Sequence, residues 1–492
     1  MNLINLLNSV DVEIGLFGQT FDVYLNWIGK IIQFLISGVG VVGIGIILFS
    51  LILKLVVLPF DVYQRISMRK QNIKMKENQE RMEKLQKQYA NDKEKYNQKV
   101  MEMYKESGVS MFSSCLPMIL SMIIFIVAIN AFNAYSQYSN IENYNTMVEA
   151  YNTKMEYYCA DLTEENIRIE GDKIVVKDEK GENSYIYYTL LVSEDTPTEK
   201  KDIVAYVNAN KTQCVYMVDV EKAYKNKEIA EYTKAKVAAA VEENDKTENA
   251  APLTEQQKAD VAKSAIKSYF EEKAQEAVVE TYNTTVKEHT SFLWIKNIWA
   301  TDASYKHPVL NYSEFKTEIE REDFRIGNNK VSLNAVGKYT NVYTADAYNK
   351  ITAKLTEAKS EANGYYVLIL LSIGTILLQQ FISMRSQKEQ QKFSTVDGQG
   401  ASQQKMMMII MTGMFAIFSF MYSSAFSIYM ITSNLFSMLS TVVINKLVDR
   451  SEYKKEKEEI VKRHDQRLRM NRSMENAKEN ATRKNKENKG KK

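Results

Sequence analysis

The sequence is poor in the residues that build disulfide frameworks and metal sites. Its 492 residues include three cysteines and three histidines, and we find no spacing of metal ligands, no nucleophile–base grouping and no phosphate-binding loop. Cys159 and Cys214 fall in one soluble segment, where a disulfide and two free thiols are equally compatible with the sequence. We therefore expect no catalytic residues, no metal and no cofactor, and we keep this cysteine pair as a candidate disulfide.

The amino-terminal stretch also lacks the basic start of a secretory signal and the arginines of a transit peptide. Lys30 is the first positive residue, and three acidic residues precede it. Residues 20–38 contain the amphipathic run FDVYLNWIGKIIQFLISG, with glycines at positions 38 and 40. We predict that residues 1–38 form an outer amino-terminal segment, whose helix lies flat at the membrane interface and ends in a bend.

Long hydrophobic runs, by contrast, are abundant. Each approaches or exceeds the ~20 residues that a helix needs to cross ~30 Å of hydrocarbon. The last two runs join into one charge-free stretch of about 40 residues, twice the length of a single span, so we expect a turn near residues 421–424. The sequence thus predicts a membrane protein with five transmembrane helices, at residues 39–60, 114–136, 364–383, 406–422 and 424–446.

Charge is distributed unequally between the segments that connect these spans. Residues 61–113, the loop 384–405 and the tail 447–492 are basic, whereas residues 136–363 carry more acids than bases. Because short basic loops stay in the cytoplasm, five spans place the amino terminus outside and the carboxyl terminus in the cytoplasm. All three basic segments then fall on the same side of the membrane, which supports the predicted number of spans.

Residues 61–113 are predicted to form a cytoplasmic helical hairpin. Apolar residues recur at spacings of three, four and seven, and QYANDKEKY offers a turn near residues 91–92. The two helices either pack only on each other or also present methionines to hydrophobic clients, because methionine adapts to irregular apolar partners. The methionines that we assign to client contact are Met68, Met75, Met82 and Met103.

The long segment between the second and third spans has mixed character. Alternating apolar residues in IRIEGDKIVVKDEKGENSYIYYTLLV and in DIVAYV predict strands, with a hairpin near residues 179–182. A helical pattern follows, in which Thr254 and Gln257 resemble a capping box. We therefore predict an inserted extracytoplasmic α+β domain over residues 137–290, followed by a further outer segment over 291–363.

The tail at residues 447–492 is polar and rich in lysine and arginine. Two interpretations of this composition stand side by side. The tail acts as a topology signal that contacts lipid headgroups, or it makes a salt-sensitive contact with ribosomal RNA phosphates. Composition alone does not choose between them, because both partners are anionic.

Four motifs, in the same order along the chain, resemble those of the YidC-type membrane protein insertases. They are LILKLVVLPFDVYQ in the first span, GVSMFSSCLPMIL at the start of the second, SFLWIKNIWATD at residues 291–302, and QQKMMMIIMTGMF with FSIYMITSNLFSMLS in the closing pair of spans. The chain departs from the family pattern at several positions. Lys54 stands where the family usually has arginine, and Met430 stands where an aromatic residue is expected.

The resemblance implies five helices around a hydrophilic groove that is open to the cytoplasm and to lipid but closed to the outside. It places the cation Lys54 in that groove, where it attracts the acidic tails of clients. The structural alternative is that Lys54 snorkels to the headgroups, because Asp61 at the cytoplasmic end is only seven residues away. Other residues that we assign to the substrate groove are Gln379, Gln380, Ser427, Tyr429 and Met430.

The function implied by the resemblance is that of a membrane protein insertase and chaperone in the bacterial cytoplasmic membrane. Such a protein needs no nucleotide hydrolysis and is not an enzyme. The implied partners are nascent membrane proteins, the ribosome through the basic tail and loops, the general secretion channel and membrane lipids, but not DNA. The alternative is a membrane-anchored display or sensor scaffold for the outer domain. A channel or transporter is disfavoured, because it would usually show internal repeats or several charged residues within its spans.

Overall fold

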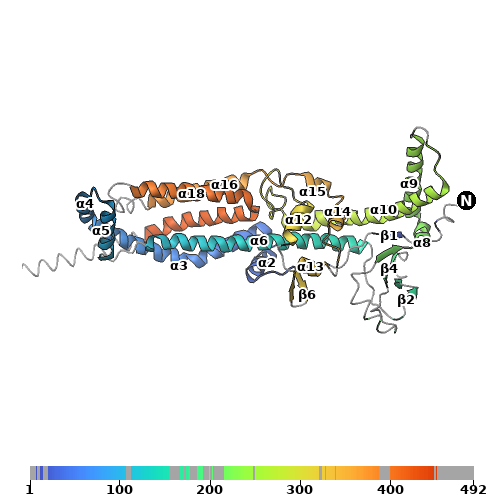
Figure 1. Ribbon diagram of the computed structural model, residues 1–492, viewed down its shortest axis with the longest axis horizontal. Helices are drawn as coiled ribbons and strands as arrows, with labels where there is room; N and C mark the ends of the chain where they lie inside the picture. The colour runs from blue at the N-terminus through green and yellow to red at the C-terminus, as the bar shows by residue number, and fades with distance from the viewer. Residues whose placement is uncertain are drawn as a thin grey trace, which may run out of the picture. The chain divides into compact units, whose positions relative to one another are not determined.

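The computed structural model shows a mostly helical chain with one five-stranded sheet (Figure 1). It describes residues 20–106, 112–154, 215–247, 250–320, 329–337, 340–386 and 399–447, together with five short strand segments and a few isolated positions. The chain forms two compact units. The first comprises Met1–Phe49, Val127–Leu370 and Ile417–Ile428, and the second comprises Ser50–Ile126, Leu371–Ala416 and Tyr429–Lys492.

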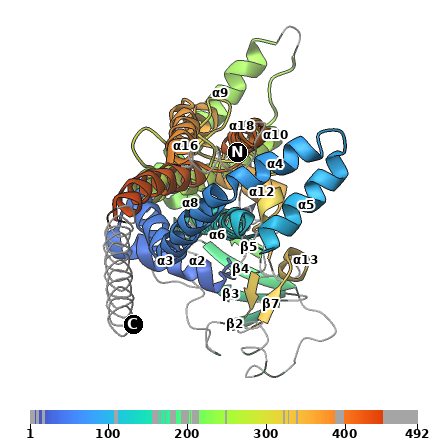
Figure 2. The same ribbon diagram turned by 90° about the vertical axis from the view of Figure 1, so that its left-hand side faces the viewer.

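The sheet of the first unit is antiparallel, with the strand order β1-β5-β4-β3-β2, and Figure 2 labels β5, β4, β3 and β2 of this series. Three of its strands confirm the strands and the hairpin predicted from alternation, because β2, β3 and β4 pair in succession. In DIVAYV, however, Asp202 and Ala205 have helical backbone, so the strand predicted there is wrong at these two positions. The strands are β1 (Val12–Ile14), β2 (Ile167–Glu170), β3 (Lys173–Lys177), β4 (Ile186–Leu191) and β5 (Val215–Val218).

One edge of this sheet comes from the amino-terminal segment, which sequence reasoning did not predict. Strand β1 pairs with β5, so that Val12 lies opposite Val218 and Ile14 lies opposite Tyr216. Val218 is completely buried and belongs to the hydrophobic core of the first unit, against which Val12 of β1 also packs. The segment before the first span is therefore part of the same folded unit as the inserted domain.

Helices follow the sheet where the helical pattern predicted them. They are α8 (Val220–Lys225), α9 (Lys227–Asp245), α10 (Glu255–Thr281), the π-helix η2 (Tyr282–Val286) and α11 (Lys287–Thr290). The capping box at the start of α10 is confirmed. The Thr254 side chain accepts from the Gln257 amide, and the Gln257 side chain accepts from the Thr254 amide, so two orphan donors of the first turn are satisfied.

The core of the first unit is built around the carboxyl-terminal half of α6 (Phe112–Lys154), a single helix of 43 residues. It continues from the predicted span 114–136 into the predicted insertion, so no break in secondary structure marks residue 137. Tyr144 on α6 contacts the rings of Phe315 and Tyr348 at centroid distances of 4.8 and 5.1 Å. Later elements that cover this core are α12 (Tyr312–Ile319), β6 (Phe324–Ile326), β7 (Asn329–Val331), α13 (Leu333–Val336), α14 (Ala345–Ile351) and α15 (Thr356–Ser360).

The helix and bend predicted before the first span are confirmed as α2 (Trp27–Val39). The Asn26 side chain accepts a hydrogen bond from the Gly29 amide at 2.8 Å and caps the start of α2. Gly40 ends the helix with φ of 75°, a left-handed conformation that glycine adopts without strain. Trp27 and Phe34 are 72% and 75% exposed, so one face of α2 presents large apolar side chains.

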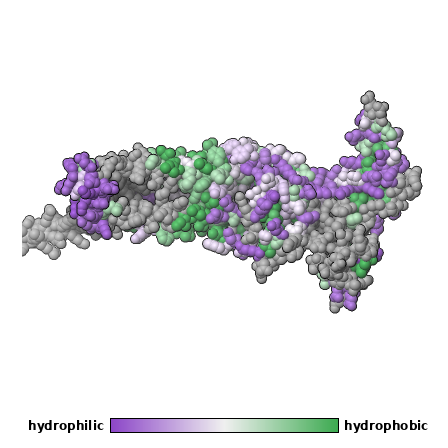
Figure 3. All heavy atoms as spheres, viewed as in Figure 1, coloured by the Kyte–Doolittle hydropathy of each residue, from purple (hydrophilic) through white to green (hydrophobic). Residues whose placement is uncertain are grey.

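The second unit holds the hairpin and most of the long apolar helices. The hairpin is formed by α4 (Gln79–Gln88) and α5 (Lys93–Glu106), with the predicted turn at residues 89–92. Figure 3 shows hydrophilic atoms over α4 and α5, and hydrophobic atoms over α3 and α16. The long helices are α3 (Val42–Glu77), which begins in the first unit, α16 (Val367–Ser386), α18 (Gln399–Met421) and the closing helix (Ser424–Leu447).

Three helices within the described residues are long and apolar enough to cross a membrane, at Val42–Ser67, Val367–Arg385 and Ser424–Leu447. They coincide with the predicted first, third and fifth spans. The predicted spans 114–136 and 406–422 fall on α6 and α18, whose side chains lie partly outside the described set. The count of five spans therefore stays a prediction.

Candidate functional site

Helix α3 has two chemically different faces within the second unit. The charged residues Lys54, Asp61 and Arg65 fall within ~40° of one another at ~100° per residue, and we call them the charged stripe. All three are half-buried. The opposite side of the helix carries large exposed apolar side chains, namely Ile52, Leu55, Val56, Phe60 and Tyr63. Lys54 therefore does not project from the apolar face, which is the side suited to contact with lipid chains.

Arg65 joins the charged stripe to the closing helix. Its guanidinium donates from Nη2 to Thr441 Oγ1 at 2.5 Å and from Nη1 to Asn445 Oδ1 at 3.1 Å. Both acceptors are neutral, so these bonds position the guanidinium without cancelling its charge. Asp61 lies one helical turn away, and its negative charge acts on both Lys54 and Arg65. The stripe thus alternates in sign along the helix.

Two further hydrogen bonds connect apolar helices of the second unit. Thr412 Oγ1 donates to Gln380 Oε1 at 2.8 Å and joins α18 to α16. Asn434 Nδ2 donates to Thr375 Oγ1 at 3.3 Å and joins the closing helix to α16. Such bonds between membrane helices are worth about 0.6–2 kcal/mol each, and they place polar groups where the surrounding side chains are apolar.

Four of the residues that the sequence assigned to a groove lie in the same compact unit as Lys54. Gln379 and Gln380 are half-buried on α16, and Tyr429 and Met430 are 3% and 5% exposed on the closing helix, all in the second unit with Lys54. Ser427 is buried in the first unit. Sequence reasoning did not assign Asp61, Arg65, Thr441, Asn445, Thr412 or Asn434 to the site. The spacing of seven and eleven residues after Lys54 was the signal that could have identified Asp61 and Arg65.

The methionines assigned to client contact divide into two groups. Met82 and Met103 are 2% and 3% exposed and form a small core between α4 and α5, with Leu85 and Val100 packed against it. The structure therefore uses them to hold the hairpin together, and they are not on its surface. The side chains of Met68 and Met75 lie outside the described set, as do the candidate disulfide residues Cys159 and Cys214.

In the first unit, the segment 291–302 makes hydrogen bonds to three helices. The Ala300 carbonyl accepts from the Ser424 amide at 2.8 Å and from its hydroxyl at 2.7 Å, which fixes the start of the closing helix. The Ser136 hydroxyl of α6 donates to the Trp299 carbonyl at 3.1 Å. Asp302 is completely buried and accepts from the Leu368 amide at 2.6 Å in the first turn of α16.

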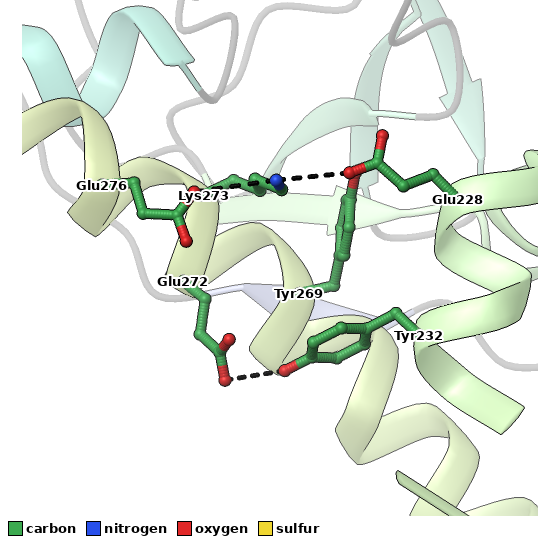
Figure 4. Close-up of a pocket in the computed structure, with 6 residues that line it drawn as sticks. All are labelled: Glu228, Tyr232, Tyr269, Glu272, Lys273 and Glu276. Carbon is green, nitrogen blue, oxygen red and sulfur yellow. Dashed lines mark hydrogen bonds and ion pairs between the residues drawn. The ribbon is translucent and has the colours of Figure 1, made fainter. Parts of the chain in front are cut away.

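A cavity of about 190 Å³ lies between α9 and α10 in the first unit (Figure 4). Its charged side chains pair with one another. Tyr232 donates to Glu272 at 2.7 Å, and Lys273 lies 3.2 Å from Glu228. These two contacts join α9 to α10 and give Glu272 and Glu228 each a partner. Within the described ranges, no group of three histidine, cysteine, aspartate or glutamate side chains could hold a metal ion.

Comparison with known proteins identifies the family. The sequence model of the family described as "60Kd inner membrane protein" matches residues 34–193 and 276–452, more than half of the chain. The unmatched residues 194–275 lie inside the predicted insertion, and they include β5, α8 and α9. No solved structure matches the chain significantly.

Curated relatives named "Membrane protein insertase YidC" match a shorter region. The protein of Caldanaerobacter subterraneus subsp. tengcongensis is 37% identical over 98 residues, which is 20% of this chain and 46% of the relative. The Fusobacterium nucleatum protein is 38% identical over 84 residues, 17% of this chain and 39% of the relative. The Clostridium tetani protein is 40% identical over 84 residues, 17% of this chain and 36% of the relative. Each alignment thus spans less than half of the relative.

These matches confirm the resemblance read from the four motifs, and they extend it. The family model includes Lys54, the segment 291–302 and the closing helix within its two matched regions. Because the match covers more than half of the sequence, the chain belongs to the 60Kd inner membrane protein family, whose curated relatives here are YidC insertases.

Proposed function

We propose that this protein inserts nascent membrane proteins into the membrane and assists their folding. The single observation that carries the proposal is the charged stripe. Three half-buried ionisable residues lie on α3 opposite its apolar face, in a family whose relatives are named insertases. Lys54 lies within the predicted first span, where an ionisable residue is expensive and marks a functional pathway. Asp61 and Arg65 follow it on the same side of the helix, at the cytoplasmic end of the span.

The physical task of an insertase is to reduce the cost of moving a polar tail through hydrocarbon. Each desolvated polar group of that tail costs several kcal/mol when it has no partner. A hydrated groove beside Lys54 shortens the dry path, and the cation attracts carboxylates of the tail more strongly than it would in bulk water. The apolar part of the client then moves sideways into lipid, and burial of its side chains supplies the driving force. No nucleotide hydrolysis or covalent chemistry is required, so the protein acts as a chaperone and not as an enzyme.

The proposed topology follows from the charges of the connecting segments. Five spans place the amino terminus outside and the carboxyl terminus in the cytoplasm of a bacterial cell, with the basic segments 61–113, 384–405 and 447–492 inside. The first unit's sheet and helices are then extracytoplasmic. The exposed apolar face of α2 lies on the outer leaflet, since Trp27 and Phe34 suit the interface.

The proposed partners follow from the same arrangement. Nascent membrane proteins are the clients, and the basic tail and cytoplasmic loops contact the ribosome through the phosphates of its RNA. Membrane lipids surround the apolar helices. The general secretion channel is a further partner, for clients whose extracytoplasmic parts are too long for a groove.

A depletion strain tests the role of Lys54. We expect Lys54→Ala to lower insertion of a small client with an acidic outer tail about tenfold, because an interaction with a charged partner contributes about 1.5–3 kcal/mol. Lys54→Arg keeps the charge and should preserve insertion. Lys234→Ala, which removes an exposed lysine of α9, is the matched control. Normal insertion by Lys54→Ala would refute the groove mechanism.

A second candidate function is display of the outer domain, favoured by the 194–275 segment that the family match omits. Replacing residues 194–275 by a short glycine–serine linker separates the two functions. Retained insertion would make the segment accessory to an insertase. Total loss of complementation of a depletion strain by a folded variant would instead favour the display function.

A further inference from the structure

The charged stripe carries more ionisable groups than a single-cation groove needs. Lys54, Asp61 and Arg65 are separated by seven and four residues, which corresponds to about 10 Å and 6 Å along the helix axis. The order of signs is positive, negative, positive. A helix that needed only one cation would not need to bury a carboxylate and a guanidinium beside it, because every additional buried charge requires compensation.

Arg65 is fixed in a way that leaves it able to bind an anion. Among the described residues, its guanidinium donates two hydrogen bonds, to the neutral oxygens of Thr441 and Asn445, and Thr441 is only 4% exposed. A guanidinium has five N–H donors, so these two bonds leave donors for another acceptor. Holding the planar group in place also lowers the entropy that is lost when a carboxylate binds.

Asp61 occupies the position between the two cations. It lies one turn from Arg65 and two turns from Lys54, and its charge acts on both. In the absence of a client, this carboxylate reduces the cost of two half-buried positive charges. A client carboxylate that binds either cation must compete with it.

We propose that Arg65 is a second anion-binding position of the groove, which receives a carboxylate of the client's tail before Lys54 does, and that Asp61 is the resident counter-ion that this carboxylate displaces. The proposal rests on the insertase function proposed above and deepens it by naming the preferred client chemistry. The ligand is an aspartate- or glutamate-containing peptide segment. Its carboxylates bind first at Arg65 and then at Lys54, which lies about 16 Å further along the helix axis.

Proteoliposomes of phosphatidylethanolamine and phosphatidylglycerol that contain the full-length protein provide the test. A single-span client is made in two forms, whose translocated tails differ only in two aspartates or two asparagines. The protease-protected fraction measures insertion. We expect R65Q to lower insertion of the aspartate form about tenfold and to leave the asparagine form unchanged. R65K restores the charge and should recover most of the loss, and D61N should raise insertion of the aspartate form above wild type.

The opposing result is equally specific. If R65Q lowers both client forms to the same extent, Arg65 is only a structural link between α3 and the closing helix, and the proposal is overturned. N445L removes one of the linking bonds but keeps the charge, so it should retain the preference for the aspartate form even if R65Q does not fold. If the proposed groove function of Lys54 is itself wrong, the result is different, because K54A would then insert both client forms as well as wild type does.

Discussion

Glu142 makes the stability of the first unit depend on pH, and the effect can be worked out from its surroundings. It lies on α6, outside the predicted span 114–136, and is half-buried. Burial raises the pKa of its carboxyl from an ordinary value of 4.5 to about 7, with smaller contributions from the neighbouring acids Asp22 and Glu149. The Val23 amide opposes the rise by donating a hydrogen bond to the carboxylate.

The sign and size of the effect follow from proton linkage. Between pH 4.5 and 7 the folded state holds a proton on Glu142 that the unfolded state has released, so the free energy of unfolding falls as the pH rises through this window. The loss is complete above about pH 7. A pKa rise of this size corresponds to about 3 kcal/mol as an upper figure, since the carboxyl is partly solvated.

Glu142→Gln removes this dependence, because the amide stays neutral and its oxygen still accepts from the Val23 amide. For a unit of roughly 300 residues, about 3 kcal/mol corresponds to about 5 °C in the unfolding midpoint. We expect the variant to match wild type at pH 4.5 and to unfold about 5 °C higher at pH 8, measured by tryptophan fluorescence of the detergent-solubilised protein. Glu280→Gln, at an exposed site on α10, is the control. Parallel curves for wild type and Glu142→Gln across this range would refute the reasoning.

Two further substitutions test internal packing, one in each unit. Asp302→Ala should lower the free energy of unfolding of the first unit by about 3 kcal/mol, because it removes the side-chain acceptor of the part-buried Tyr365 amide and of the buried Leu368 amide at the start of α16. Asp302→Asn should cost less, and equal midpoints for these two variants would contradict the capping role. Met82→Ala should cost the α4–α5 hairpin about 2–5 kcal/mol and speed its amide hydrogen exchange, whereas Met101→Ala, at a 59% exposed site, should not. Unchanged exchange in Met82→Ala would show that the hairpin does not depend on this core.

The sequence predicted local structure well wherever a repeating pattern or a cap determined it. Strands β2 to β4, the capping box at Thr254, the bend at Gly40 and the turn of the hairpin all followed from short-range chemistry. It missed strand β1, because three residues carry too little periodicity to identify a strand. Its pairing with β5 depends on residues about two hundred positions away.

For the candidate site too, some features follow from one segment of sequence and others depend on how the helices pack. The sequence by itself determined the family, the position of Lys54 within a hydrophobic run and the apolar stripes of the hairpin, because composition and spacing are properties of one segment. Tertiary structure decided that Arg65 bonds to Thr441 and Asn445, that Met82 faces Met103, and that the segment 291–302 holds three helix ends. Those contacts join residues far apart in the chain, and which side chains meet is set by how whole helices pack.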